Sequence, residues 1–277
     1  MADLSKDYES GNGNHANLVP ELERIRTAGS ISISPELFER LYLTPQNVVK
    51  GDLRKTFGNP TPLALIGFLI CLTPLSCDLM GWRGGGGSGA AGTASYFFFG
   101  GILMLVGGIL EFFLGNTFPF VVFGSFGAFW LSYGGTLQPF FNAAGAYAGG
   151  DQAAGLSSPG FSNSFAFFLL FIGIMCFIYM IAALRTNIVF FLIFLMLVLT
   201  LTLLAGAFWQ IGHGNAAYGN TLQIAGGACG FVTCLLGWYI FTSQILLSVD
   251  FPFELPIGDL STVIKGGRDR RSTSKEN

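Results

Sequence analysis

Charged residues are scarce in this chain, and their scarcity limits what the protein can be. Only 11% of its 277 residues are Asp, Glu, Lys or Arg, whereas an average soluble domain carries about 25%. Apolar residues make up 51%, and Gly, which is frequent in membrane helices, occurs 39 times. A net charge of −2 provides no bulk attraction to nucleic acid, so we expect no nucleic-acid partner. The composition predicts a membrane protein.

The sequence also lacks the patterns of a metal site, a disulfide framework or an active site. Its five cysteines lie inside apolar runs and form no Cys-x-x-Cys pair, so we expect them to pack as small hydrophobic side chains. No nucleophile–base or metal-ligating constellation is visible. We therefore expect no metal, no cofactor and no enzymatic activity. No apolar segment follows a basic start, so we expect insertion to depend on the first spanning helix.

Six long apolar runs dominate what is present. Each is close to the ~20 residues that cross about 30 Å of hydrocarbon as a helix. The runs are approximately 62–80, 94–114, 118–138, 164–184, 188–208 and 225–247. The predicted fold class is an all-α integral membrane protein with six transmembrane helices. We expect a cytoplasmic and largely disordered tail over 1–56, the helical domain over 57–249 and a cytoplasmic tail over 250–277.

The basic residues predict the orientation of the six spans. Of the 14 Lys and Arg residues, 13 fall in the two tails or in the loop between spans four and five, and Arg83 alone falls in an opposite loop. Lys and Arg are enriched in cytoplasmic loops. Both tails are therefore expected in the cytoplasm.

Two loops carry further information. Residues 84–89 are rich in glycine but lack the Lys that completes a phosphate-binding loop, so a flexible linker is the better interpretation. Only residues 115–117 connect spans two and three, so these spans are expected to form an antiparallel hairpin.

The boundary at 57–68 organises the chain, because a polar tail ends there and the apolar runs begin. Pro60 and Pro62 cost little in the first turn of a helix, and Asn59 is suited to capping that turn. One interpretation is simply a helix start. The other is a turn inside a membrane pore, whose free N–H groups and positive helix end favour an anion.

Ionisable groups near membrane helices are functional candidates because their burial is costly. Asp78 can reach the outer headgroups, and Arg185 can extend to the inner interface. Glu111 lies about one turn from the inner end of span two. It is either a helix-end carboxylate that reaches interfacial water or a proton-carrying or inner-gate carboxylate.

Four ordered motifs resemble the acetate uptake transporter family, which includes bacterial succinate–acetate permeases and fungal acetate/ammonia-export proteins. Residues 59–68 resemble its Asn-Pro-Ala-Pro-Leu-Gly-Leu signature with a following Phe, and depart from it at Thr61 and Ala64. Glu111 with residues 115–118 is similar to the second motif, and residues 124–130 to the third. Residues 184–191 resemble the fungal members in particular.

The resemblance implies a hexamer of six-helix protomers in the plasma membrane, each with a pore that carries acetate or related short carboxylates, commonly with protons. It places pore contacts at Asn59, Pro60 and Pro62. A narrow apolar constriction is implied at Phe68, Phe126 and Ile193, where bacterial relatives often have Tyr in place of Phe126. Gly237 matches a small-residue position tied to substrate size. Alternative functions are ammonia or ammonium export, an acetate-sensing receptor, and a structural scaffold.

Overall fold

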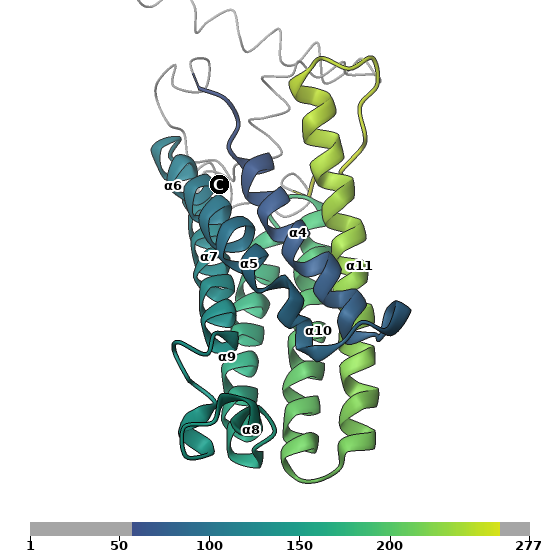
Figure 1. Cartoon of the computed structure of the whole chain (residues 1–277). Coiled ribbons are helices and arrows are strands. Elements are labelled where there is room, and N and C mark those ends of the chain that lie inside the picture. The colour runs from purple at the N-terminus through teal and green to yellow at the C-terminus, as the bar shows by residue number, and fades with distance from the viewer. Residues whose placement is uncertain (1–56, 261–277) are drawn as a thin grey trace, which may run out of the picture. The chain divides into compact units, whose positions relative to one another are not determined.

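The computed structural model describes residues 57–260, and this part of the chain is built from helices (Figure 1). Six of the helical segments described are long and apolar enough to cross a membrane. The predicted all-α membrane protein with six spans is thereby confirmed. The predicted disorder of 1–56 and the last part of the predicted C-terminal tail concern residues outside the described range.

The six spans follow the apolar runs of the sequence. The first is α4 (Thr61–Leu79), and the second consists of η2 (Gly87–Gly92), α5 (Thr93–Ser95), η3 (Tyr96–Leu103) and α6 (Met104–Phe113). The others are α7 (Thr117–Leu137), α9 (Pro159–Ala183), α10 (Ile188–Gly212) and α11 (Ala216–Ser248). Short helices η1 (Trp82–Gly84), η4 (Gly145–Tyr147) and α8 (Gln152–Leu156) lie in the loops.

Four spans are longer than the hydropathy of the sequence predicts. The clearest case is α11, which begins at Ala216 instead of near residue 225. Its extra turns contain polar residues such as Asn220 and Gln223. Helical hydrogen bonds continue past the apolar core of a membrane span, whereas hydropathy marks only the part in hydrocarbon. An apolar run therefore underestimates such a helix.

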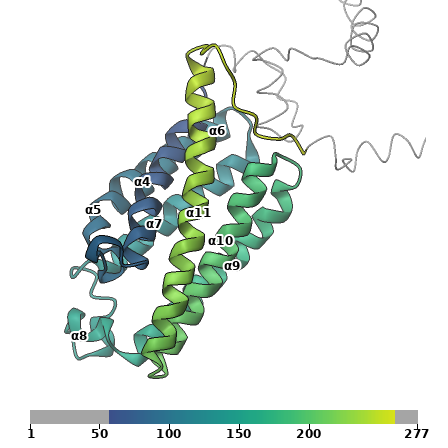
Figure 2. The ribbon, with the colours of Figure 1, turned by 90° about the vertical axis from the view of Figure 1, so that its right-hand side faces the viewer.

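The spans pack on one another in a closed order, and Figure 2 shows α11 with α9 and α10 on one side of it and α4 on the other. Helix α10 lies between α9 and α11, α11 packs on α4, and α4 packs on η3 and α6, which pack on α7. A 3.0 Å hydrogen bond between the hydroxyls of Ser125 in α7 and Tyr179 in α9 completes the circuit. The short link between α6 and α7 makes them the predicted antiparallel hairpin.

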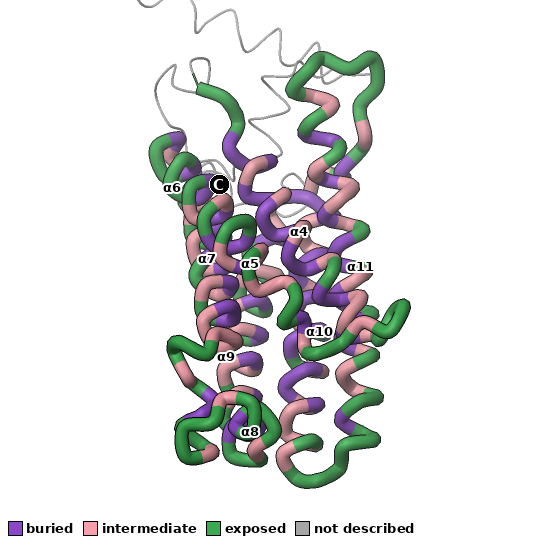
Figure 3. Tube along the Cα trace, in the orientation of Figure 1, coloured by how far each residue is buried: buried purple, intermediate pink, exposed green. Residues whose placement is uncertain are grey.

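Glycine brings neighbouring helices close together, as expected for helix packing in lipid. A Cβ atom on Gly107 of α6 would lie 2.8 Å from the Cβ of Ala64 in α4, which is closer than side chains pack. Large apolar side chains such as Phe98, Phe171 and Leu235 remain exposed, and exposed residues recur along the spans (Figure 3). An outward apolar surface is what contact with lipid requires.

The glycine-rich loop after α4 is not the flexible linker that its composition suggests. It forms 3₁₀ turns with positive φ at Gly84, Gly87 and Gly89, a conformation that glycine adopts without strain. The Tyr96 hydroxyl donates a 2.7 Å hydrogen bond to the Gly89 carbonyl, and the Tyr133 hydroxyl donates to the carbonyl of Ser88. Two spans therefore hold the loop in place.

The start of α4 and the end of α11 lie at the same end of the bundle, which we call the tail end; the opposite end is the loop end (Figure 1). After α11 the chain folds back along the tail end. The Gly258 carbonyl accepts a 2.8 Å hydrogen bond from the N–H of Ile188, and the N–H of Leu260 donates to the Thr186 carbonyl at 3.0 Å. The first part of the predicted C-terminal tail is thus packed on the helices.

Candidate functional site

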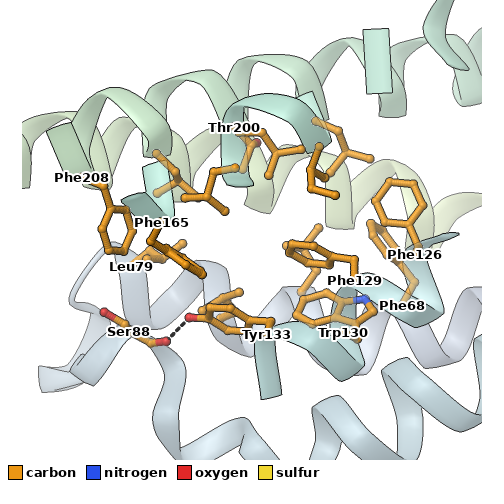
Figure 4. A pocket seen from close by; sticks show the side chains of 17 residues that line it. Phe68, Leu79, Ser88, Phe126, Phe129, Trp130, Tyr133, Phe165, Thr200 and Phe208 are labelled. Atoms are coloured by element: carbon orange, nitrogen blue, oxygen red, sulfur yellow. Dashed lines mark hydrogen bonds between the residues drawn. The ribbon is translucent and has the colours of Figure 1, made fainter. Parts of the chain in front are cut away.

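An apolar cavity lies between α4, α7, α9 and α10, from the middle of the bundle toward the loop end (Figure 4). We call it the loop-side cavity. It offers about 60 Å³ to the centres of water-sized groups. Seventeen side chains line it; none is charged, and those with polar atoms are Ser88, Trp130, Tyr133 and Thr200.

A second, smaller cavity of about 20 Å³ lies nearer the tail end. We call it the tail-side cavity. It is formed where α4, α7 and α10 begin, and its lining is apolar apart from the hydroxyls of Thr61 and Thr186. The two cavities share α4, α7 and α10, so they follow each other along the same three helices.

Phe68 and Phe126 lie where the two cavities approach each other. Their rings meet edge to face, with centroids 5.8 Å apart, and both line the tail-side limit of the loop-side cavity. The tail-side cavity is lined by Thr61, two helical turns before Phe68, and by Phe123, one turn before Phe126. Phe68 on α4 and Phe126 on α7 therefore each lie where the lining of the tail-side cavity ends and that of the loop-side cavity begins.

Ile193 occupies the corresponding position on α10. Phe190, three residues earlier, lines the tail-side cavity, and Leu197, four residues later, lines the loop-side cavity. Residues three and four apart share a helix face, so Ile193 lies on the face that connects the cavities. It is 5% exposed. Ile193 itself lines neither cavity, but its spacing along α10 puts it at the level between the two cavities, as Phe68 and Phe126 are on α4 and α7.

Asn59 accepts a backbone hydrogen bond at the start of α4, as the sequence predicts, but it lies one residue before the N-cap position. The Asn59 side-chain oxygen accepts a 3.0 Å hydrogen bond from the N–H of Thr61, while Pro60 occupies the N-cap position. Pro60 and Pro62 are buried but line neither cavity, whereas Thr61 between them does. The motif therefore reaches the tail-side cavity through Thr61, which sequence analysis registered only as a departure from the family signature.

The expectation of free backbone donors at this helix end is wrong. Asn59 occupies the N–H of Thr61, and Pro62 has no N–H. The N–H groups of Leu63 and Ala64 both donate to the Pro60 carbonyl, at 3.1 and 3.4 Å. The proline spacing and the Asn cap satisfy the first turn internally, so only the helix dipole is left to favour an anion.

Glu111 is fully buried, at 0% exposed, so the interpretation that it reaches interfacial water is wrong. Its carboxylate accepts hydrogen bonds from the Thr61 hydroxyl and from the Asn116 side-chain amide. It therefore joins the end of α6 to the starts of α4 and α7. Glu111 lines neither cavity, but its hydrogen bond with Thr61 connects it to the lining of the tail-side cavity.

Gly237 of α11 faces α4 instead of a cavity. A Cβ atom there would lie 2.7 Å from the Leu69 Cδ2 atom, and neither residue lines a cavity. Its geometry explains close packing of α11 on α4, and the link to substrate size stays a prediction. Asp78 and Arg185 also line neither cavity.

The described part of the chain has six helices that can span a membrane and two apolar cavities that follow each other along three of them. This arrangement defines a membrane protein of the channel and transporter class. The chain belongs to the GPR1/FUN34/yaaH family, whose model matches residues 43–262. This confirms the family that the sequence motifs indicated.

Named relatives agree with this assignment. The chain is 47% identical over 234 residues to Protein alcS of Aspergillus fumigatus, covering 84% of this chain and 86% of the relative. It is 35% identical over 204 residues to Acetate transporter protein patA of Aspergillus clavatus, covering 74% and 79%. The solved bacterial acetate channel SatP has the same fold, with a TM-score of 0.57, 24% identity and coverage of 73% of this chain and 99% of that one.

Proposed function

We propose that this protein transports acetate and related short monocarboxylates across a membrane, together with protons, along the path of the two cavities. The observation that carries the proposal is the contact of Phe68 with Phe126 at the tail-side limit of the loop-side cavity, beyond which a second cavity follows along the same three helices. The position of Ile193 on α10, between residues that line the two cavities, supports its inclusion in the gate. The choice of substrate is supported by family membership and by relatives named for acetate transport.

The three residues act as a dry gate in this proposal. Apolar constrictions in pores block passage by excluding water. An ionised carboxylate that enters such a constriction loses hydration without gaining a partner, and this costs several kcal/mol or more. A proton that travels with the carboxylate removes most of that cost, which is why we couple acetate movement to protons.

The tail-side cavity then faces the cytoplasm. In this proposal Asn59, Pro60 and Pro62 shape its entrance by holding Thr61, which lines it, and Glu111 acts through Thr61 as the coupling or inner-gate residue. Support for the orientation comes from 13 of the 14 Lys and Arg residues on that side of the spans. The resemblance to the family supports a hexamer in the plasma membrane.

The test is uptake of labelled acetate by proteoliposomes that contain the purified full-length chain. Uptake should exceed that of protein-free liposomes, saturate with acetate and increase with an inward proton gradient. Absence of uptake, with acetate binding retained, would favour the receptor. Ammonium flux without acetate flux in the same vesicles would favour ammonia export.

A further inference from the structure

One polar group in the wall of the loop-side cavity has no partner within the described part of the chain. Trp130 is 1% exposed and lines the cavity, and its Nε1–H donates to none of the acceptors described. A buried donor without an acceptor is unfavourable and therefore rare in native proteins. In Figure 4 the indole nitrogen lies on the side of the ring toward Phe68, at the tail-side limit of the cavity.

The buried hydroxyls of the cavity are already committed as donors. The Tyr133 hydroxyl donates to the Ser88 carbonyl, and the Thr200 hydroxyl donates to the Met196 carbonyl at 2.8 Å. Both oxygens can still accept a hydrogen bond, but neither has a second hydrogen to give. Among the buried side chains of the lining, Trp130 therefore supplies the available donor.

The position of this donor is fixed by its surroundings. The indole ring stacks on Tyr96, with ring centroids 5.1 Å apart and 17° between the planes, and meets Phe129 at 5.2 Å. The backbone of Gly100 lies directly behind it, since a Cβ atom there would be 2.5 Å from the Cγ atom of Trp130. A donor that is held in place loses little conformational freedom when a ligand binds.

Volume and charge define the ligand. About 10–15 Å³ accommodates the centre of one water-sized group, so the roughly 60 Å³ available holds about four to six such groups, which is enough for a short carboxylic acid. Acetic acid has four non-hydrogen atoms. The lining carries no charged side chain, so an ionised carboxylate, which needs donors at both oxygens, would remain uncompensated.

We propose that Trp130 Nε1 donates a hydrogen bond to the carbonyl oxygen of a short monocarboxylic acid, which occupies the loop-side cavity in its neutral, protonated form. The proposal rests on the transport function proposed above and makes Trp130 a substrate-binding residue. A dicarboxylic acid is disfavoured, because its second carboxyl group meets apolar walls.

Two tryptophan variants test the hydrogen bond. Trp130→Phe keeps an aromatic ring and removes the donor. Trp238→Phe is the matched control, because Trp238 lines neither cavity. Its Nε1–H already donates to the Thr73 hydroxyl at 3.1 Å. In acetate uptake by proteoliposomes, Trp130→Phe should raise KM about tenfold without lowering the maximal rate, and Trp238→Phe should leave KM within about twofold. An unchanged KM in an active Trp130→Phe protein overturns the proposal.

Competition by acetamide tests the charge of the bound form. Acetamide is neutral and offers a carbonyl oxygen in a molecule of the same size as acetic acid. It should inhibit acetate uptake by the wild type, and about tenfold more weakly in Trp130→Phe. Failure of acetamide to compete in the wild type shows that the ionised form binds, which overturns the proposal.

Direct binding separates this proposal from the transport function. The chain has four Trp residues, so the indole N–H signal of Trp130 can be assigned in ¹⁵N-labelled protein by Trp→Phe changes at the other three. Titration with acetate should move this signal and leave that of Trp238 unchanged. A shift without any uptake refutes transport and supports the site; a static signal in a protein that transports acetate overturns the site. The site itself is unaltered here, so the result does not depend on whether Trp130→Phe folds.

Discussion

Replacing Gly100 by Ala tests whether the wall of the loop-side cavity is as tightly packed as the structure shows. The added Cβ would lie 2.5, 2.6 and 2.8 Å from the Cγ, Cβ and Cδ1 atoms of Trp130. These atoms are close to the backbone of α7, so the indole cannot move aside by a simple rotation of its tip. Such overpacking costs about 1–3 kcal/mol, and up to about 1 kcal/mol is recovered because Ala favours the helix more than Gly.

The middle of this range is a net loss of about 1.5 kcal/mol, or a fall in Tm of roughly 3–6 °C for a chain of this size. Acetate uptake at matched protein content should also fall, because Trp130 is displaced. Gly206→Ala is the control: its Cβ would meet only the Leu222 Cδ1 atom at 3.4 Å, an ordinary contact. The measurement is the Tm of each detergent-solubilised variant in thermal unfolding, and Gly100→Ala should have the lower value. Equal Tm values for the two would refute the packing argument.

Three further substitutions test the passage. Asn59→Ala leaves the Thr61 N–H without its cap, and we expect about 1 kcal/mol lower stability and reduced acetate uptake with normal membrane insertion; full uptake at equal expression would limit Asn59 to a structural role. Glu111→Gln keeps the volume and removes the charge, so the pH dependence of uptake should flatten, whereas a wild-type pH profile would contradict a coupling role. Ile193→Ala should let succinate or lactate compete with acetate, and an unchanged order of preference in a well-expressed variant would refute the gate assignment.

The membrane spans were predictable because a helix in hydrocarbon has few alternatives. Every backbone polar group must be satisfied within the segment, so about 20 consecutive apolar residues are sufficient evidence for a helix. The loops obey no such rule. The glycine-rich loop after α4 was misjudged because composition does not reveal that Tyr96 and Tyr133, far apart in the sequence, both bind its carbonyls.

The candidate site was predictable only in part. Phe68, Phe126 and Ile193 could be named from the family motifs, but their common level depends on how α4, α7 and α10 align, which no local pattern specifies. Glu111 was recognised as a candidate, yet its burial and its bond to Thr61 were not foreseeable, because they require the starts of α4 and α7 to meet the end of α6. In a chain with 29 Phe, composition cannot show which rings face a cavity.

In the proposed transport path, the arrangement along α7 would make one passage both selective and permeable. Phe126, Trp130 and Tyr133 follow at helical spacing on the face that lines the loop-side cavity. Phe126 offers no hydrogen bond, and the Tyr133 hydroxyl is committed to the Ser88 carbonyl, so the available donor on this face is Trp130. A single hydrogen bond contributes up to about 1.5 kcal/mol net. That is enough to orient a small acid beside the gate and too little to retain it, and conduction requires both properties of a binding site.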